Sequence, residues 1–131
     1  GDATEVGTSV SGGYENVASR PFASVSGGEF NEARGQTSSV SGGYRNLAGG
    51  FYTSVSGGSH NETSSSGASV CGGTGNLASG AFASVSGGWL NQALLDYSTV
   101  SGGKGRRAEV VIKNNKLKSY LWVAGTLMEE D

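Results

Sequence analysis

The sequence contains one cysteine, one proline, one methionine and one histidine among its 131 residues. A single cysteine excludes a framework of intrachain disulfides, which stabilises many small secreted domains. The single histidine, His60, cannot supply a catalytic base or a set of metal ligands to a motif that is repeated along the chain. We therefore expect no enzymatic activity, no metal site and no cofactor.

Strong charge and long apolar runs are also absent. The formal net charge is −2 at pH 7, so nothing indicates nucleic acid as a partner. No apolar stretch approaches the roughly 20 residues of a transmembrane helix, and we expect no direct insertion into a membrane. The first residues do not resemble a signal peptide, which indicates a mature chain or an excised fragment.

Glycine, by contrast, is abundant and periodic. The chain has 24 glycines, and the sequence Ser-Val-Ser-Gly-Gly begins at Ser9 and returns every 15 residues, with small variations, as far as Thr99. An asparagine follows the glycine pair at a fixed distance, and an alanine or threonine follows two residues later. Such strict spacing argues for an ordered repeat protein and against a flexible glycine-serine linker.

A unit of 15 residues is too short for a helical hairpin and suits one coil of two short strands and two turns. The sequence therefore predicts an all-β fold, a parallel β-solenoid or β-roll of seven 15-residue coils with a C-terminal cap. We assign the repeat domain to residues 1–108 and the capping segment to residues 109–131. In one coil, the strands are expected at residues 23–26 and 31–33.

Alternation of side chains along each strand assigns the faces of the coil. Ala23 and Val25 are expected inside, Ser24 and Ser26 outside, and Asn31 inside at the turn. Stacking of the coils would then place like residues over like, with hydrogen bonds from the asparagine amides to the next coil. The predicted structural ladders are Val10, Val25, Val40, Val55, Val70, Val85 and Val100, and Asn16, Asn31, Asn46, Asn61, Asn76 and Asn91.

The combination of Ser-Val-Ser-Gly-Gly with the following Asn-x-Ala resembles the YadA-like head repeats of trimeric autotransporter adhesins, over about residues 1–108. The resemblance implies a left-handed parallel β-roll that associates as a trimer, carries no catalytic residues and binds host matrix or other cells. The family unit is slightly shorter and has a second aliphatic residue where this chain has glycine. Neither a long heptad stalk nor a membrane anchor is present in this sequence.

Three motifs that suggest chemistry are better explained by the repeat. Ser-Gly-Gly resembles the surroundings of a protease nucleophile, but its copies cannot share the one histidine. Asn61 begins a glycosylation sequon, but it is in phase with the ladder asparagines. Cys71 replaces the serine equivalent to Ser26 and is interpreted as a neutral substitution. If that face lined a trimer axis, three such cysteines would approach one another.

Some large apolar residues interrupt the repeat and are candidates for binding. The residue after the glycine pair varies between copies and should project from a turn, and the sixth copy is the most apolar. Exposed apolar clusters often mark contacts, either with a ligand, with another subunit or with a terminal cap. The predicted contact surface consists of Tyr14, Tyr44, Trp89, Leu90, Leu94 and Leu95.

The repeat ends after Gly103. Residues 109–113 are rich in β-branched side chains and predict a strand, Asn114-Asn115 predicts a turn, and residues 116–128 suit either a strand or a short helix. An open solenoid end exposes backbone and apolar surface, so we expect this segment to act as a cap. Its basic residues are either a solvated surface or a patch for an acidic partner.

These observations favour a structural or adhesive head of a surface fibre, located outside the cell or on its surface. We expect a homotrimer joined along the face of Phe22, Ser24 and Ser26, because a slim coil buries little area alone. Its ligand would be a host-surface protein or a glycan. The alternatives are an end-to-end structural filament, a phage or viral fibre domain, and an ice-binding solenoid that uses the regular serine columns.

Overall fold

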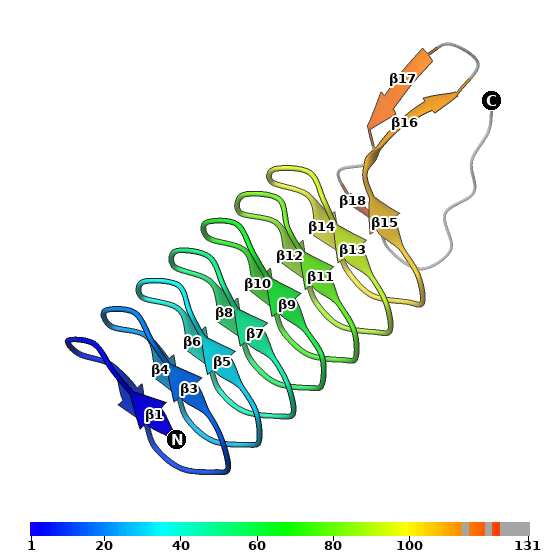
Figure 1. The fold of residues 1–131 in the computed structure, drawn as a ribbon. Coiled ribbons are helices and arrows are strands. Elements are labelled where there is room, and N and C mark those ends of the chain that lie inside the picture. Colours follow the sequence, from blue (N-terminus) through cyan, green and yellow to red (C-terminus); the bar gives the residue numbers. More distant parts are fainter. Residues whose placement is uncertain (114–115, 120–121, 124–131) are drawn as a thin grey trace.

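A computed structural model describes residues 1–113, 116–119 and 122–123 of the chain. The fold is an all-β solenoid in which two eight-stranded parallel sheets run along the same axis (Figure 1), with no helix among the described residues. The odd-numbered sheet contains β1 (Asp2–Ala3), β3 (Val17–Ala18), β5 (Glu32–Ala33), β7 (Leu47–Ala48), β9 (Glu62–Thr63), β11 (Leu77–Ala78), β13 (Gln92–Ala93) and β15 (Arg107–Ala108). The even-numbered sheet contains β2 (Ser9–Val10), β4 (Ser24–Val25), β6 (Ser39–Val40), β8 (Ser54–Val55), β10 (Ser69–Val70), β12 (Ser84–Val85), β14 (Thr99–Val100) and β18 (Trp122–Val123).

The predicted coil of 15 residues is confirmed by the strand pairing. Val25 pairs in parallel with Val40, and Ala33 pairs with Ala48, so each strand lies beside its equivalent in the next coil. The strands are two residues long, shorter than the sequence predicts, because the turns take up most of each coil. We call the segment from an even-numbered to the next odd-numbered strand the glycine turn, and the return segment the variable turn.

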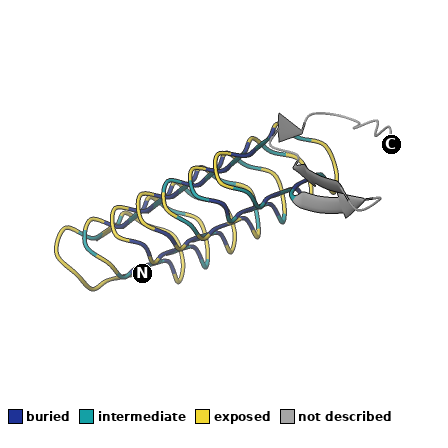
Figure 2. Cartoon of the chain, turned by 90° about the horizontal axis from the view of Figure 1, so that it is seen from above, coloured by how far each residue is buried: buried dark blue, intermediate teal, exposed yellow. Residues whose placement is uncertain are grey.

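The interior is narrow and holds small side chains only. Ala23, Val25 and Ala33 are fully buried, whereas Ser26 is exposed, which confirms the predicted faces of the strands. Burial follows the strands along the whole rod, and most exposed residues lie in the turns (Figure 2). Every valine of the predicted ladder is buried except Val10, which is partly buried at the first complete coil.

The asparagine ladder is also confirmed, with backbone atoms as the partners of the amides. Asn31 is fully buried, and its Nδ2 donates to the carbonyl oxygen of Gly27 at 3.0 Å and to that of Gly43, in the next coil, at 2.9 Å. The same pattern is repeated at each ladder asparagine from Asn16 to Asn91. Each side chain therefore closes its own glycine turn and joins it to the next one.

The glycine pair divides into two different positions. The second glycine has positive φ, as at Gly28 with 82°, and a Cβ there would collide with the carbonyl oxygen of Gly43. Only glycine fits both conditions. At the first glycine, Gly27, φ is not positive and a Cβ would meet no atom within 4 Å, so the turn itself does not require glycine there.

The variable turn also contains a residue in the left-handed region. Phe22 lies in this turn with φ 61°, outside the two-residue strand β4. A Cβ on Gly7 would lie 2.6 Å from Phe22 Cδ1, so the ring packs against the equivalent glycine of the preceding coil. The alternation that placed Phe22 on the face of Ser24 therefore does not extend to it, because alternation holds only in extended backbone.

After β15 the chain leaves the solenoid and then returns to it. β16 (Val110–Lys113) and β17 (Lys116–Ser119) form an antiparallel hairpin, and β18 then pairs in parallel with β14. The predicted strand at 109–113 is confirmed, and residues 116–119 and 122–123 are strand. The predicted capping segment thus contributes a strand to the even-numbered sheet. The predicted turn at Asn114-Asn115, residues 120–121 and residues 124–128 lie outside the described residues.

Candidate functional site

The predicted contact residues occupy three separate places. Tyr14 and Tyr44 lie on the glycine turns of the N-terminal coils, and Trp89 lies on the same edge three coils beyond Tyr44. All three project outward as predicted, with 57% of Tyr14 and 45% of Trp89 exposed. Leu94 and Leu95 follow β13 in the variable turn, at the other edge of the coil, and are partly buried. The six residues therefore do not form one surface.

Four ring systems form a row along the N-terminal glycine turns, which we call the aromatic row: Tyr14, Phe30, Tyr44 and His60. Successive ring centroids lie 5.6, 5.9 and 5.5 Å apart, in edge-to-face arrangements. Edge-to-face contacts place the positive ring edge against the negative ring face and stabilise such pairs. The row presents a continuous aromatic surface along the solenoid axis.

Phe30 and His60 belong to this row although they were not among the predicted contact residues. They belong to the position after the variable residue of the glycine turn, where φ is 56° at Phe30 and 55° at His60. This backbone conformation lets each ring contact tyrosines of neighbouring coils. The available signal was that Tyr14 and Phe30, like Tyr44 and His60, are 16 residues apart, one more than the repeat.

Charged groups surround the aromatic row. The guanidinium carbon of Arg45 lies 5.5 Å from the ring centroid of Phe30 and 5.2 Å from that of Tyr44, within range of a cation–π interaction. A hydrogen bond to the Glu15 carboxylate and repulsion from its charge raise the pKa of the Tyr14 hydroxyl, with smaller contributions from burial and from Glu29. Tyr14 is therefore a neutral hydrogen-bonding group at physiological pH.

A second, smaller cluster lies at the C-terminal glycine turns. The Nζ of Lys104 lies 4.5 Å from the ring centroid of Trp89, and a Cβ on Gly75 would lie 2.7 Å from Leu90 Cδ2. Trp89 and Leu90 are both exposed, so this cluster combines an apolar surface with one positive charge.

Two other predicted positions have structural environments. Asn61 is 1% exposed, and its Nδ2 donates to the carbonyl oxygens of Gly57 and Gly73, so the sequon asparagine is a ladder residue. Cys71 is exposed in the column of Ser26 and has no disulfide partner among the described residues. The described residues contain no group of three or more His, Cys, Asp or Glu side chains that could hold a metal ion.

The outer surface of the even-numbered sheet is uniform. It carries the first serine of each repeat, partly buried as at Ser24, and the second serine, exposed as at Ser26. The first glycine of the pair follows directly. We call these three columns the serine face. No charged residue occurs in any of the three columns from coil to coil.

No known family model matches this chain, and no curated protein matches it either. The described residues include no helix that could cross a membrane.

Proposed function

We propose that this chain is a non-enzymatic segment of a surface fibre, which self-associates as a homotrimer along the serine face and acts in adhesion through its outward edges. The observation that carries this proposal is the first glycine of each pair. A Cβ at Gly12, Gly27, Gly42, Gly57, Gly72 or Gly87 would contact nothing within 4 Å. Because the isolated coil would accept alanine there, the repeated glycine is explained by close approach of a second surface.

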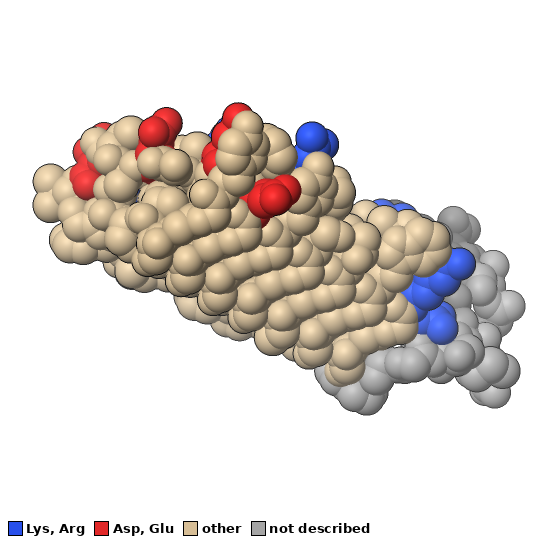
Figure 3. Space-filling view, turned by 90° about the horizontal axis from the view of Figure 1, so that it is seen from below, with Lys and Arg blue, Asp and Glu red and all other residues tan. Residues whose placement is uncertain are grey.

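The serine face suits such an approach in shape and charge. Space-filling Figure 3 shows part of the solenoid surface as regular ridges without charged side chains, and none of the three columns of the serine face carries a charged residue. A rotationally symmetric assembly would repeat the same contact at every coil, and the area buried would grow with the length of the rod. The resemblance of the repeats to those of trimeric adhesins supports three as the number of subunits.

An arginine in the middle of the serine face tests the proposal. Ser56 is exposed at a central coil, and Ser56→Arg would place a large charged side chain in the contact. We expect sedimentation equilibrium to give a trimer for the native chain and a monomer for Ser56→Arg. Glu62→Arg, which places the same side chain on the odd-numbered sheet, is the matched control and should remain trimeric. A monomeric native chain, an open-ended polymer, or a trimeric Ser56→Arg variant would contradict the proposal.

Substitution of the first glycine gives a more delicate test. Gly57→Ala adds one methyl group where the isolated chain has open space, so the coil should fold normally while association weakens. Gly58→Ala is the contrasting variant, because at φ 81° its Cβ would collide with the carbonyl oxygen of Gly73 and destabilise the coil itself. If Gly57→Ala leaves the dissociation constant of the trimer unchanged, the main support for the serine face as the trimer interface is removed.

A further inference from the structure

From β1 to β13, the outward residues of the odd-numbered sheet alternate with a period of two coils, and Arg107 in β15 ends the alternation. The aliphatic side chains of Val17, Leu47 and Leu77 lie in every second strand. The strands between them carry an acid or an amide at the same position: Asp2, Glu32, Glu62 and Gln92. The 15-residue repeat therefore contains a 30-residue repeat in this outward column, and the position of Phe30 and His60 in the glycine turn, which alternates with Glu15 and Arg45, follows the same period.

Two hollows follow this column beside the aromatic row. One hollow of about 530 Å³ is lined by Tyr14, Val17 and Phe30, among others, and a second of about 530 Å³ is lined by Leu47, His60 and further residues. Both include Phe30 and Glu32 in their walls, so they are neighbours along the solenoid axis, and we call the two hollows together the groove. The aromatic row forms one wall of the groove, and the alternating column forms its floor.

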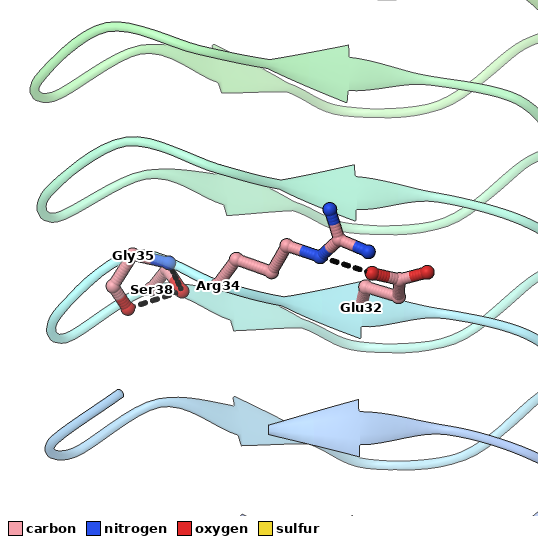
Figure 4. A network of polar contacts seen from close by, with 4 residues as sticks. All are labelled: Glu32, Arg34, Gly35 and Ser38. Atoms are coloured by element: carbon pink, nitrogen blue, oxygen red, sulfur yellow. Dashed lines mark hydrogen bonds and ion pairs between the residues drawn. The ribbon is translucent and has the colours of Figure 1, made fainter. Parts of the chain in front are cut away.

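The groove combines ring surface with polar groups of both signs. Glu32 forms an ion pair with Arg34, which lies along the sheet beside it (Figure 4). Glu62 is exposed at the other end of the second hollow and forms no ion pair with any described residue. Rings that can stack on C–H groups, next to carboxylates that accept hydrogen bonds from hydroxyls, are the chemistry that recognises a sugar.

The spacing of the groove distinguishes a polysaccharide from an extended peptide. Neighbouring coils are about 4.8 Å apart and the two-coil period is about 9.6 Å, whereas an extended peptide repeats its side chains on one face every 6.7 Å or so. A sugar in an extended β-1,4-linked chain advances by nearly one coil, and successive sugars are turned over by half a turn. Alternate sugars would therefore meet alternate aliphatic and polar rows.

The charges in the groove select among such chains. The side chains that line the two hollows include Asp2, Glu15, Glu32 and Glu62 as carboxylates, and Arg34 and Arg45 as guanidinium groups. Acidic side chains also gather along one edge of the N-terminal half of the molecule (Figure 3). The excess of negative charge would repel an acidic polysaccharide and attract one with protonated amino groups.

We propose that this groove binds an extended β-1,4-linked polysaccharide, one sugar per coil, and prefers chains that carry amino groups. The proposal names the ligand of the adhesive function given above and in that respect rests on it. The sugar makes its contacts within a single chain, on the sheet opposite to the serine face, so binding and trimer formation can be measured separately.

The test uses β-1,4-linked glucosamine oligomers of two, four and six sugars, with a β-1,4-linked glucose hexamer and a β-1,4-linked mannuronate hexamer for comparison. By calorimetry on the full chain, we expect affinity to rise with oligomer length, the glucose hexamer to bind more weakly and the acidic hexamer not to bind. Equal affinity for the dimer and the hexamer, preference for the acidic oligomer, or no binding of the glucosamine hexamer would overturn the proposal.

Variants in the groove locate the site. Glu62→Gln should weaken binding of the glucosamine hexamer about tenfold, as expected when a charge-assisted hydrogen bond is replaced by a neutral one. Phe30→Ala should weaken it about fivefold through loss of ring contact. Thr74→Ala, on an exposed glycine turn that lines neither hollow, is the control and should bind normally. Unchanged binding in both groove variants would place the site elsewhere.

Measurement on the monomer separates the two proposals. If Ser56→Arg gives a monomer that still binds the glucosamine hexamer with native affinity per chain, both proposals stand. If the native chain is a trimer that binds none of the oligomers, only the groove proposal fails. If the native chain binds the hexamer but sediments as a monomer, only the assembly proposal fails.

Discussion

The side-chain carbonyl oxygen Oδ1 of Asn31 accepts a hydrogen bond from the backbone N–H of Asn46, 15 residues later, at 2.9 Å. Each side chain of the ladder thus satisfies a donor on the following coil while its own Nδ2 satisfies two carbonyl groups. Both atoms of the amide are used with their polarity fixed, so the ladder requires an amide at this position. A carboxylate or a hydroxyl of similar size cannot make the same set of bonds.

The first prediction concerns the ladder and pH. In Asn61→Asp the carboxylate would face the carbonyl oxygens of Gly57 and Gly73, at the positions to which Asn61 Nδ2 donates. Burial and these oxygens should raise the pKa of the new carboxyl in the folded state above its unfolded value. The variant should therefore be closest to native stability at pH values below the unfolded pKa, and lose stability as pH rises through the folded pKa.

Thermal unfolding at pH 3 and pH 7, each relative to the native chain, checks this expectation. Glu62→Gln replaces an acid by an amide at the neighbouring exposed residue. Its effect on thermal stability should be nearly the same at pH 3 and pH 7. A deficit in Asn61→Asp that is the same at both pH values would mean that the carboxyl is not held against the two carbonyl groups.

A second prediction concerns a buried hydroxyl group. Thr63 replaces alanine in the interior, and its Oγ1 is buried without a hydrogen-bond partner among the described residues. Thr63→Val keeps the volume and removes the unpartnered hydroxyl, so it should increase the free energy of unfolding by about 1 kcal/mol. Thr53→Val is the opposite case, because Thr53 Oγ1 donates to the carbonyl oxygen of Gly50 at 2.9 Å.

We expect Thr53→Val to lower the free energy of unfolding by about 1 kcal/mol, because a buried carbonyl loses its donor. Chemical denaturation of both variants gives the comparison. If the two substitutions change stability in the same direction, the hydroxyl environments described above are wrong.

The third prediction concerns register. One residue inserted between Ser54 and Val55, inside β8, would turn the following side chains to the opposite face and break the pairing of Val55 with Val70. We expect a large fall in the thermal midpoint. The same insertion between Ser65 and Ser66, in a variable turn, should be accommodated with a much smaller fall, since a longer surface loop adds little closure entropy. Equal thermal midpoints for the two insertion variants would contradict the coil boundaries.

The fourth prediction compares the interior with the surface. Val55 is 1% exposed within the valine ladder, and Val55→Asp should lower the free energy of unfolding by several kcal/mol. Glu29→Ser, on an exposed glycine turn, should change it by less than about 0.5 kcal/mol. Comparable losses in the two variants, measured by denaturant titration, would mean that the faces are reversed.

The strict repeat made the interior predictable. Val25, Ala33 and Asn31 could be placed correctly because an extended strand alternates its side chains and stacked coils repeat the same environment. The turns were less accessible to this reasoning. Phe22 and Phe30 have left-handed backbone, where alternation gives no information about direction.

Contacts between different positions of neighbouring coils were also missed. The rings of Tyr14 and Phe30 meet although their positions in the repeat differ by one, and a comparison of equivalent positions does not reveal such diagonal pairs. The hairpin of β16 and β17 could not be predicted as an insertion, because nothing in the pattern marks Trp122-Val123 as the continuation of the Thr99-Val100 column.

That insertion has a practical consequence. The chain leaves the solenoid after β15, pairs β16 with β17 in antiparallel fashion and resumes pairing with the solenoid at β18, so a variable turn accepts additional strands without loss of alignment. The equivalent turn in any earlier coil offers the same opportunity. Peptides grafted there would be carried on a rigid display scaffold, and choosing the coil would set their separation in steps of about 4.8 Å.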